Sequence, residues 1–126
     1  MITLNGFDFD YYVEFQSSGQ DYGYVDFWKN NEMVIRVYVL DFDTDREYDD
    51  SPSSFNSDTG NIGYSTYSYD VVSDVAVYTE FTDAEGNVYT EEQFLENNPE
   101  INGLDRIVKQ AEEYTKNSFK DWWENQ

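Results

Sequence analysis

Residues 7–15 alternate between apolar and polar side chains, and this pattern constrains the fold more than any other feature of the chain. The odd-numbered positions are apolar or aromatic: Phe7, Phe9, Tyr11, Val13 and Phe15. Acidic side chains dominate the even-numbered positions. Because successive side chains of a strand point to opposite faces, this period of two predicts a strand with one face in the core. Further strands are expected at residues 22–28, 33–42, 63–72, 74–81 and 88–89.

The last part of the chain has a helical pattern instead. Apolar side chains recur there at steps of three and four, at Leu104, Ile107, Val108, Ala111, Phe119 and Trp122. This spacing predicts a long amphipathic helix. Its N-cap is expected at Asn98 or Asn102. A shorter helix is expected over residues 91–97, with Thr90 as N-cap and Gln93 completing a capping box.

Consecutive strands with short connections favour an antiparallel sheet, and one long helix can cover only one of its faces. We therefore expect an α+β fold: an antiparallel sheet of five or six strands with a C-terminal amphipathic helix packed on one face. The 126 residues are expected to form a single domain, 1–126. Within it, residues 1–90 are mainly β with an acidic loop at 41–61, and residues 91–126 are helical.

The charge balance points to a basic partner. The chain carries 27 acidic and 7 basic side chains, for a formal net charge of −20. Residues 1–103 hold 22 of the acidic and only 3 of the basic side chains. Such a surface repels phosphates and anionic membranes and attracts proteins of opposite charge. We therefore expect a basic, nucleic-acid-binding protein as partner, with no direct binding to nucleic acid or membrane.

The location is expected to be cytoplasmic. The first residues, MITLNGFDFDYY, lack the basic and apolar regions of a signal peptide, and no run of about 20 apolar residues is present. The chain has no Cys and no His, which removes thiolate chemistry and the commonest general base. We expect neither catalytic residues nor a cofactor.

The stretch LDFDTDREYDDSP, residues 40–52, holds six acidic side chains and a single cation, Arg46. Asp41, Asp43 and Asp45 match positions 1, 3 and 5 of a calcium-binding EF-hand loop. Arg46 stands where that loop needs glycine, and Pro52 stands where it needs a bidentate glutamate. We therefore expect no metal site here. A mobile, solvated loop remains an alternative, because residues 51–61 are rich in Ser, Asn and Gly.

A third interpretation places the acidic residues on a strand. Alternate residues of a strand share a face and lie about 6.8 Å apart, so Asp41, Asp43 and Asp45 would form a row while Phe42 points into the sheet. Such a row could occupy cationic sites that bind DNA phosphates. Nearby tyrosines and Phe55 give a composition like that of binding paratopes, although a sheet-edge cluster explains them equally well. The candidate partner-binding residues are Asp41, Asp43, Asp45, Glu47, Tyr48, Asp49, Asp50, Asp8, Asp10 and Glu14.

In size, acidity, lack of Cys and the DFDTDREYDD stretch, the chain resembles the DNA-mimic inhibitors of bacteriophages, which include anti-CRISPR proteins, anti-restriction proteins and uracil-DNA glycosylase inhibitors. The resemblance implies an inhibitor that blocks the nucleic-acid channel of a host defence nuclease, such as a CRISPR effector or restriction enzyme, without catalysis. The protein would then act in the host cytoplasm.

Proteins of other classes share parts of this pattern. An immunity protein that neutralises a basic nuclease toxin would use the same electrostatics. A virion or structural component is a further alternative. A glycosidase needs only a pair of carboxylates, but in a chain with 27 acidic residues such a pair is expected by chance.

Overall fold

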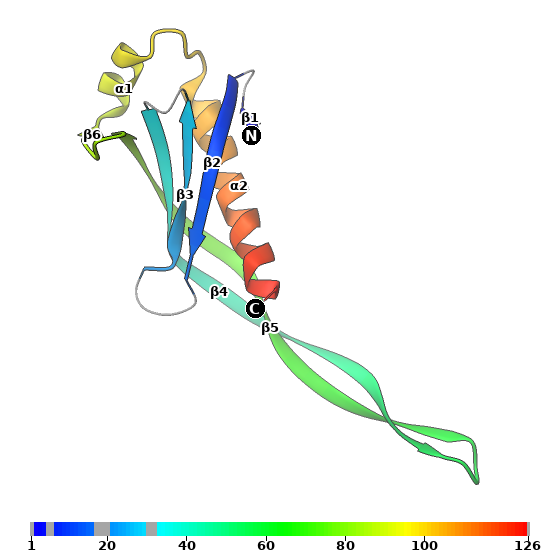
Figure 1. Ribbon diagram of the computed structural model, residues 1–126. Coiled ribbons are helices and arrows are strands. Elements are labelled where there is room, and N and C mark those ends of the chain that lie inside the picture. Colours follow the sequence, from blue (N-terminus) through cyan, green and yellow to red (C-terminus); the bar gives the residue numbers. More distant parts are fainter. Residues whose placement is uncertain (1, 5–6, 17–20, 30–32, 126) are drawn as a thin grey trace.

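The structure is a computed structural model that describes residues 2–4, 7–16, 21–29 and 33–125. Six strands form one sheet in the order β1-β2-β3-β4-β5-β6, with every neighbouring pair antiparallel (Figure 1). The strands are β1 (Ile2–Leu4), β2 (Phe7–Phe15), β3 (Gly23–Lys29), β4 (Met33–Asn56), β5 (Asn61–Asp83) and β6 (Val88–Tyr89). Two helices follow, α1 (Glu91–Asn97) and α2 (Leu104–Glu124). The expected α+β class is confirmed, with six strands.

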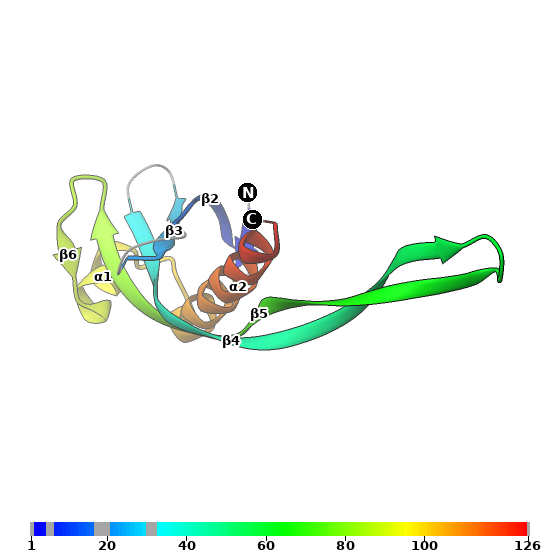
Figure 2. The same cartoon turned by 90° about the horizontal axis from the view of Figure 1, so that it is seen from below.

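Helix α2 lies across one face of the sheet (Figure 2). Alternate residues of the central strands are buried beneath it, including Val25, Phe27, Ile35 and Val37. The helix contributes Ile107 and other residues of one stripe, because its apolar side chains recur every three or four positions. Of the six apolar helix residues named from the sequence, Leu104, Ile107, Ala111 and Phe119 are buried, and Val108 and Trp122 are half-buried.

The second half of α2 packs against the ends of β2, β4 and β5, near the point where β4 and β5 leave the rest of the sheet. Phe119 is fully buried there, with its ring 5.3 Å from that of Phe15 and 5.1 Å from that of Phe42. Val72 and Val75 of β5 close the same cluster. This aromatic cluster therefore joins the end of the helix to strands β4 and β5 at the point where these two strands leave the rest of the sheet.

The helix starts differ partly from expectation. The capping box of α1 is confirmed: the Thr90 hydroxyl accepts from the Gln93 N–H, and the Gln93 side chain accepts from the Thr90 N–H. The expected N-cap of α2 was wrong, because Gly103 holds that position in the left-handed region at φ 70°. Asn98 instead caps the C-terminus of α1, where the following Pro99 prevents the helix from continuing.

The expected acidic loop at residues 41–61 was wrong. Strand β4 continues to Asn56 and β5 starts at Asn61, so only residues 57–60 form a turn. The two strands project together from the sheet as a long two-stranded ribbon (Figures 1 and 2). We call residues 41–74 the ribbon, and the rest of the described chain the body. Gly60 adopts φ 75° in the turn, a conformation that glycine tolerates best.

Candidate protein-binding surface

The candidate site is the ribbon, which holds nine acidic residues and one basic residue. Its two strands pair from Asp41 opposite Ala76 to Asn56 opposite Asn61, and the register shifts at Asp43/Thr44 and at Pro52/Ser54. Between Asp41 and Pro52, every residue of β4 follows its neighbour in the ladder without an inserted residue. The side chains of this segment therefore alternate between the two faces of the ribbon.

One face of the ribbon carries a row of carboxylates. Alternation places five of them on it, at a spacing of about 6.8 Å along β4. We call this set the carboxylate row: Asp41, Asp43, Asp45, Glu47 and Asp49.

The intervening Phe42 lies on the other side, where its ring packs against Phe119 and Trp123. This is the arrangement that the sequence predicted for the first three aspartates. Because β4 is extended, these carboxylates project along a line and do not converge as in a calcium loop. In the described part of the chain, no group of three or more potential ligands is placed to hold a metal ion.

The row is positioned by tyrosine and is not neutralised by the ribbon's one cation. The Tyr69 hydroxyl lies 3.2 Å from a carboxylate oxygen of Glu47 and 3.2 Å from one of Asp49. These contacts raise the pKa of Tyr69 to about 12, and the hydrogen bond to Asp49 is the main cause. Arg46 points to the opposite face, where its Nε lies 3.3 Å from Asp70. The row therefore keeps its negative charge available to a partner.

The three candidate residues on β2 share a face with this row. Asp8, Asp10 and Glu14 are exposed on the side of the sheet that α2 leaves uncovered. The register from β2 through β3 to β4 joins that side to the face of Asp41 and Asp43. The acidic residues of β2 and the first residues of the carboxylate row therefore lie on the same side of the sheet, with Tyr24, Tyr38 and Leu40 between them.

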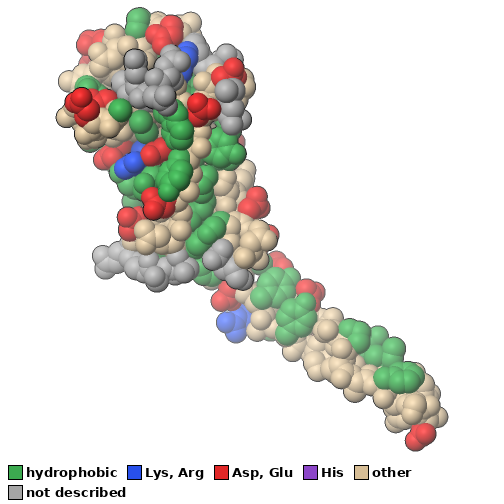
Figure 3. All heavy atoms as spheres, in the orientation of Figure 1, with side chains coloured by type: hydrophobic (Ala, Val, Ile, Leu, Met, Phe, Trp, Pro, Cys, Tyr) green, Lys and Arg blue, Asp and Glu red, His purple; other side chains and the backbone are tan. Residues whose placement is uncertain are grey.

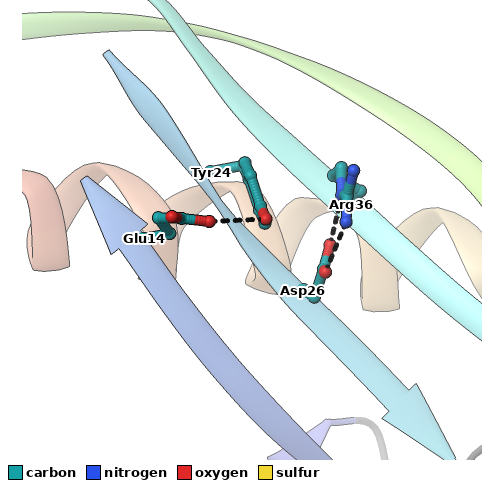
Figure 4. Close-up of polar contacts among 4 residues, drawn as sticks. All are labelled: Glu14, Tyr24, Asp26 and Arg36. Carbon is teal, nitrogen blue, oxygen red and sulfur yellow. Dashed lines mark hydrogen bonds and ion pairs between the residues drawn. The ribbon is translucent and has the colours of Figure 1, made fainter. Parts of the chain in front are cut away.

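Polar contacts order the body's part of this face. Tyr24 donates a hydrogen bond of 2.7 Å to Glu14, which raises the pKa of Tyr24 to about 12 (Figure 4). Beside it, Arg36 binds both carboxylate oxygens of Asp26, at 2.6 and 2.7 Å (Figure 4). The Arg36 guanidinium also lies 4.0 Å from the centre of the Tyr24 ring. These contacts pair the charged and phenolic groups on the uncovered side of the sheet with one another.

Two candidate residues of β4 lie outside the carboxylate row. Tyr48 and Asp50 alternate with the residues of the row, as Arg46 does, and therefore lie on the opposite face of the ribbon. Asp50 accepts a hydrogen bond of 2.6 Å from Thr66, its cross-strand neighbour. The register therefore places Tyr48 and Asp50 on the face of the ribbon opposite the five residues of the carboxylate row.

The base of the ribbon is fixed by the end of α2. The Trp123 indole N–H donates to the carbonyl oxygen of Asp70 at 3.2 Å. A groove of about 640 Å³ opens beside it, lined by acidic and aromatic side chains that include Glu47, Tyr69 and Glu124. The tryptophan therefore anchors β5 where the ribbon leaves the cover of α2.

No protein-family model matches this chain, and neither a curated protein nor a solved structure matches it. Within the described residues, no helix has the length and apolar character needed to cross a membrane.

Proposed function

We propose that this protein is an inhibitor that binds a basic nucleic-acid-binding protein, and that it does so by presenting carboxylates where the target binds phosphates. The expected target is a host defence nuclease, such as a CRISPR effector or a restriction enzyme. The carboxylate row on the freestanding ribbon is the observation that carries this proposal. The proposed action is steric occlusion of the nucleic-acid channel, without catalysis.

The spacing and shape of the row support mimicry of a nucleic-acid backbone. A strand of B-form DNA has one phosphate per roughly 3.4 Å of axis, and its helical path separates the phosphates further. Carboxylates about 6.8 Å apart can therefore meet successive cationic side chains of a phosphate-binding channel. A two-stranded ribbon also twists along its length, so the row curves as it leaves the body.

The net charge of −20 would act before contact. Complementary charge mainly accelerates encounter, and exposed charges are screened over about 8 Å at physiological ionic strength. Binding by this mechanism should therefore have a fast association rate that falls steeply with added salt.

The proposal is tested with purified enzymes: several restriction endonucleases and CRISPR effector nucleases, each cleaving a labelled DNA with and without the protein. We expect inhibition that is competitive with DNA for at least one of them. For an enzyme that is inhibited, the row variant should associate at least about 10-fold more slowly and lose most of the salt dependence. That variant combines Asp41→Asn, Asp43→Asn, Asp45→Asn, Glu47→Gln and Asp49→Asn.

The matched control removes the same total charge from exposed positions of the body. It combines Glu85→Gln, Glu92→Gln, Glu96→Gln, Glu100→Gln and Glu113→Gln. The control should inhibit nearly as well as the wild type. If both variants lose inhibition equally, charge acts without a defined site. If the enzyme binds DNA and this protein together, or if no enzyme is inhibited, mimicry is rejected.

A further inference from the structure

The ribbon has a second face, opposite the carboxylate row, and in its outer half that face is apolar. Strand β5 alternates without interruption from Asn61 to Val72, so Ile62 and Tyr64 share the face of Val72. Their cross-strand partners are Phe55 and Pro52. Tyr48 lies on the same face nearer the body, and Asp50 stands between it and Pro52. We call these five residues the apolar face: Tyr48, Pro52, Phe55, Ile62 and Tyr64.

The apolar face continues a surface that α2 covers at the base of the ribbon. Val72 is only 8% exposed beneath the helix, whereas Tyr48, Phe55 and Tyr64 are 67%, 68% and 63% exposed. Hydrophobic side chains are visible along the outer half of the ribbon in Figure 3. An isolated two-stranded hairpin is only marginally stable in water, and exposed apolar patches of several hundred Å² commonly mark binding sites. These features indicate that a binding partner covers the face.

A second copy of the chain is a poor candidate for this cover. Each copy would bury on the order of 500 Å² of these side chains, and the total of about 1,000 Å² lies at the lower limit for a specific interface. Two copies with a net charge of −20 each would also repel one another. Pairing through the strand edge is hindered by Pro52, which lacks an N–H, and by the irregular register between Pro52 and Ser54.

We propose that the ribbon inserts into a cleft of the basic partner protein, with a cationic wall against the carboxylate row and an apolar wall against the apolar face. This inference rests on the proposed function and adds the chemistry of the partner's second wall. The carboxylate row lies in the inner half of the ribbon and the apolar face mainly in its outer half, so the two walls would contact successive parts of the ribbon. The row would govern association, and the apolar face would slow dissociation.

Kinetic measurements on a nuclease that the wild type inhibits separate the two faces. Phe55→Ser combined with Ile62→Ser should dissociate at least about 10-fold faster than the wild type. Its association rate and salt dependence should be unchanged, because the carboxylate row is intact. The matched control is Leu40→Ser combined with Val88→Ser, two residues of the body that are 55% and 63% exposed. The control should dissociate like the wild type.

Because Phe55 and Ile62 are a cross-strand pair, their loss could also fray the end of the ribbon. Phe55→Leu combined with Ile62→Leu keeps the face apolar and should restore slow dissociation. Unchanged dissociation in the serine variant would overturn the inference while leaving the proposed function standing. A wild-type dimer in sedimentation equilibrium that the serine variant abolishes would assign the face to a second copy. If no nuclease binds, both proposals fail together.

Discussion

Strands β4 and β5 pass through two environments, and the difference separates what stabilises this protein from what is available to a partner. In the body, Ile35 and Val37 of β4 are fully buried under α2. In the ribbon, the same strand presents Tyr48 and Phe55 with about two-thirds of their surface exposed. Side chains alternate between two faces in both regions, but α2 covers one of those faces only in the body and at the base of the ribbon. A period of two therefore specifies a strand but not what packs against it.

Charge also differs between the two regions. In the body, Arg36 donates two hydrogen bonds to Asp26, and the Arg36 and Asp26 side chains are 31% and 14% exposed. In the ribbon, Arg46 meets Asp70 through one contact, and the side chains are 59% and 44% exposed. The body neutralises its central charge, whereas the ribbon leaves most of its charge in solvent. We expect mutations to change stability in the body and binding in the ribbon.

The largest expected contrast is between two phenylalanines. Phe119→Ala should lower the free energy of unfolding by about 3–5 kcal/mol, because it removes the fully buried ring at the centre of the aromatic cluster. Phe55→Ala in the ribbon should cost less than about 0.5 kcal/mol, as is usual for exposed positions. Urea unfolding followed by tryptophan fluorescence measures both. A loss below about 1 kcal/mol for Phe119→Ala would show that α2 is not the main cover of the sheet.

The two arginines provide a smaller contrast of the same kind. Arg36→Met should cost about 1–3 kcal/mol, because it leaves the largely buried Asp26 carboxylate without its partner. Arg46→Met should cost about 0–1 kcal/mol, the usual range for an exposed ion pair. Equal losses in urea unfolding would mean that the ribbon is as well packed as the body.

Much of the body could be predicted from the sequence, because its signals are local. The alternation over residues 7–15 gave β2, and the Thr90–Gln93 capping box gave the start of α1. The DAEGN sequence also predicts a turn, and Gly86 adopts φ 86° there. Each of these features depends on side chains close together in the chain. The start of α2 was missed because Gly103 carries no side-chain cap that a pattern could reveal.

The strand expected at residues 63–72 lies within β5, but the β4 half of the ribbon was expected as a loop, because its pairing depends on residues distant in the chain. Asp, Ser, Asn and Pro are depleted in strands, so residues 41–56 have the composition of a loop. All of them except Ser53 nevertheless pair with a residue of β5, as Asp50 does with Thr66 and Glu47 with Tyr69. The tyrosines between residues 64 and 69 were the available signal, since aromatic residues favour strands and cross-strand pairs. The carboxylate row could still be proposed, because it requires only an extended chain.

Salt tests whether the body and the ribbon unfold together. At a net charge of −20, self-repulsion opposes folding, so the melting temperature should rise by several degrees between 10 mM and 0.5 M NaCl. The variant that combines Asp45→Asn, Glu47→Gln and Asp49→Asn should have a higher melting temperature at 10 mM NaCl. Its melting temperature should also rise less between 10 mM and 0.5 M NaCl. Scanning calorimetry at both salt concentrations measures this. An unchanged melting temperature in the variant would show that the ribbon unfolds independently of the body. A shift with millimolar calcium beyond that of matched ionic strength would contradict the strand geometry of the row.

The smallest expected effect is the titration of two tyrosines, one in each region. Tyr69 in the ribbon and Tyr24 in the body each have a pKa raised to about 12, because their hydroxyls donate to Asp49 and Glu14 respectively. A nearby carboxylate favours the neutral phenol, so each contact persists below the ordinary pKa of about 10 and is lost as the pH rises through 12. Glu47→Gln combined with Asp49→Asn should lower the pKa of Tyr69 toward 10 and leave that of Tyr24 unchanged.

Carbon-13 NMR of the tyrosine rings follows both groups in one sample, so unfolding at high pH would be recognised because it moves both. A wild-type Tyr69 that titrates near 10 would mean that its hydroxyl does not hold Glu47 and Asp49. The carboxylate row would then be mobile in the free protein, and a partner would have to order it on binding. A pKa near 12 would mean that the row is held in place before a partner arrives, which lowers the entropy cost of binding.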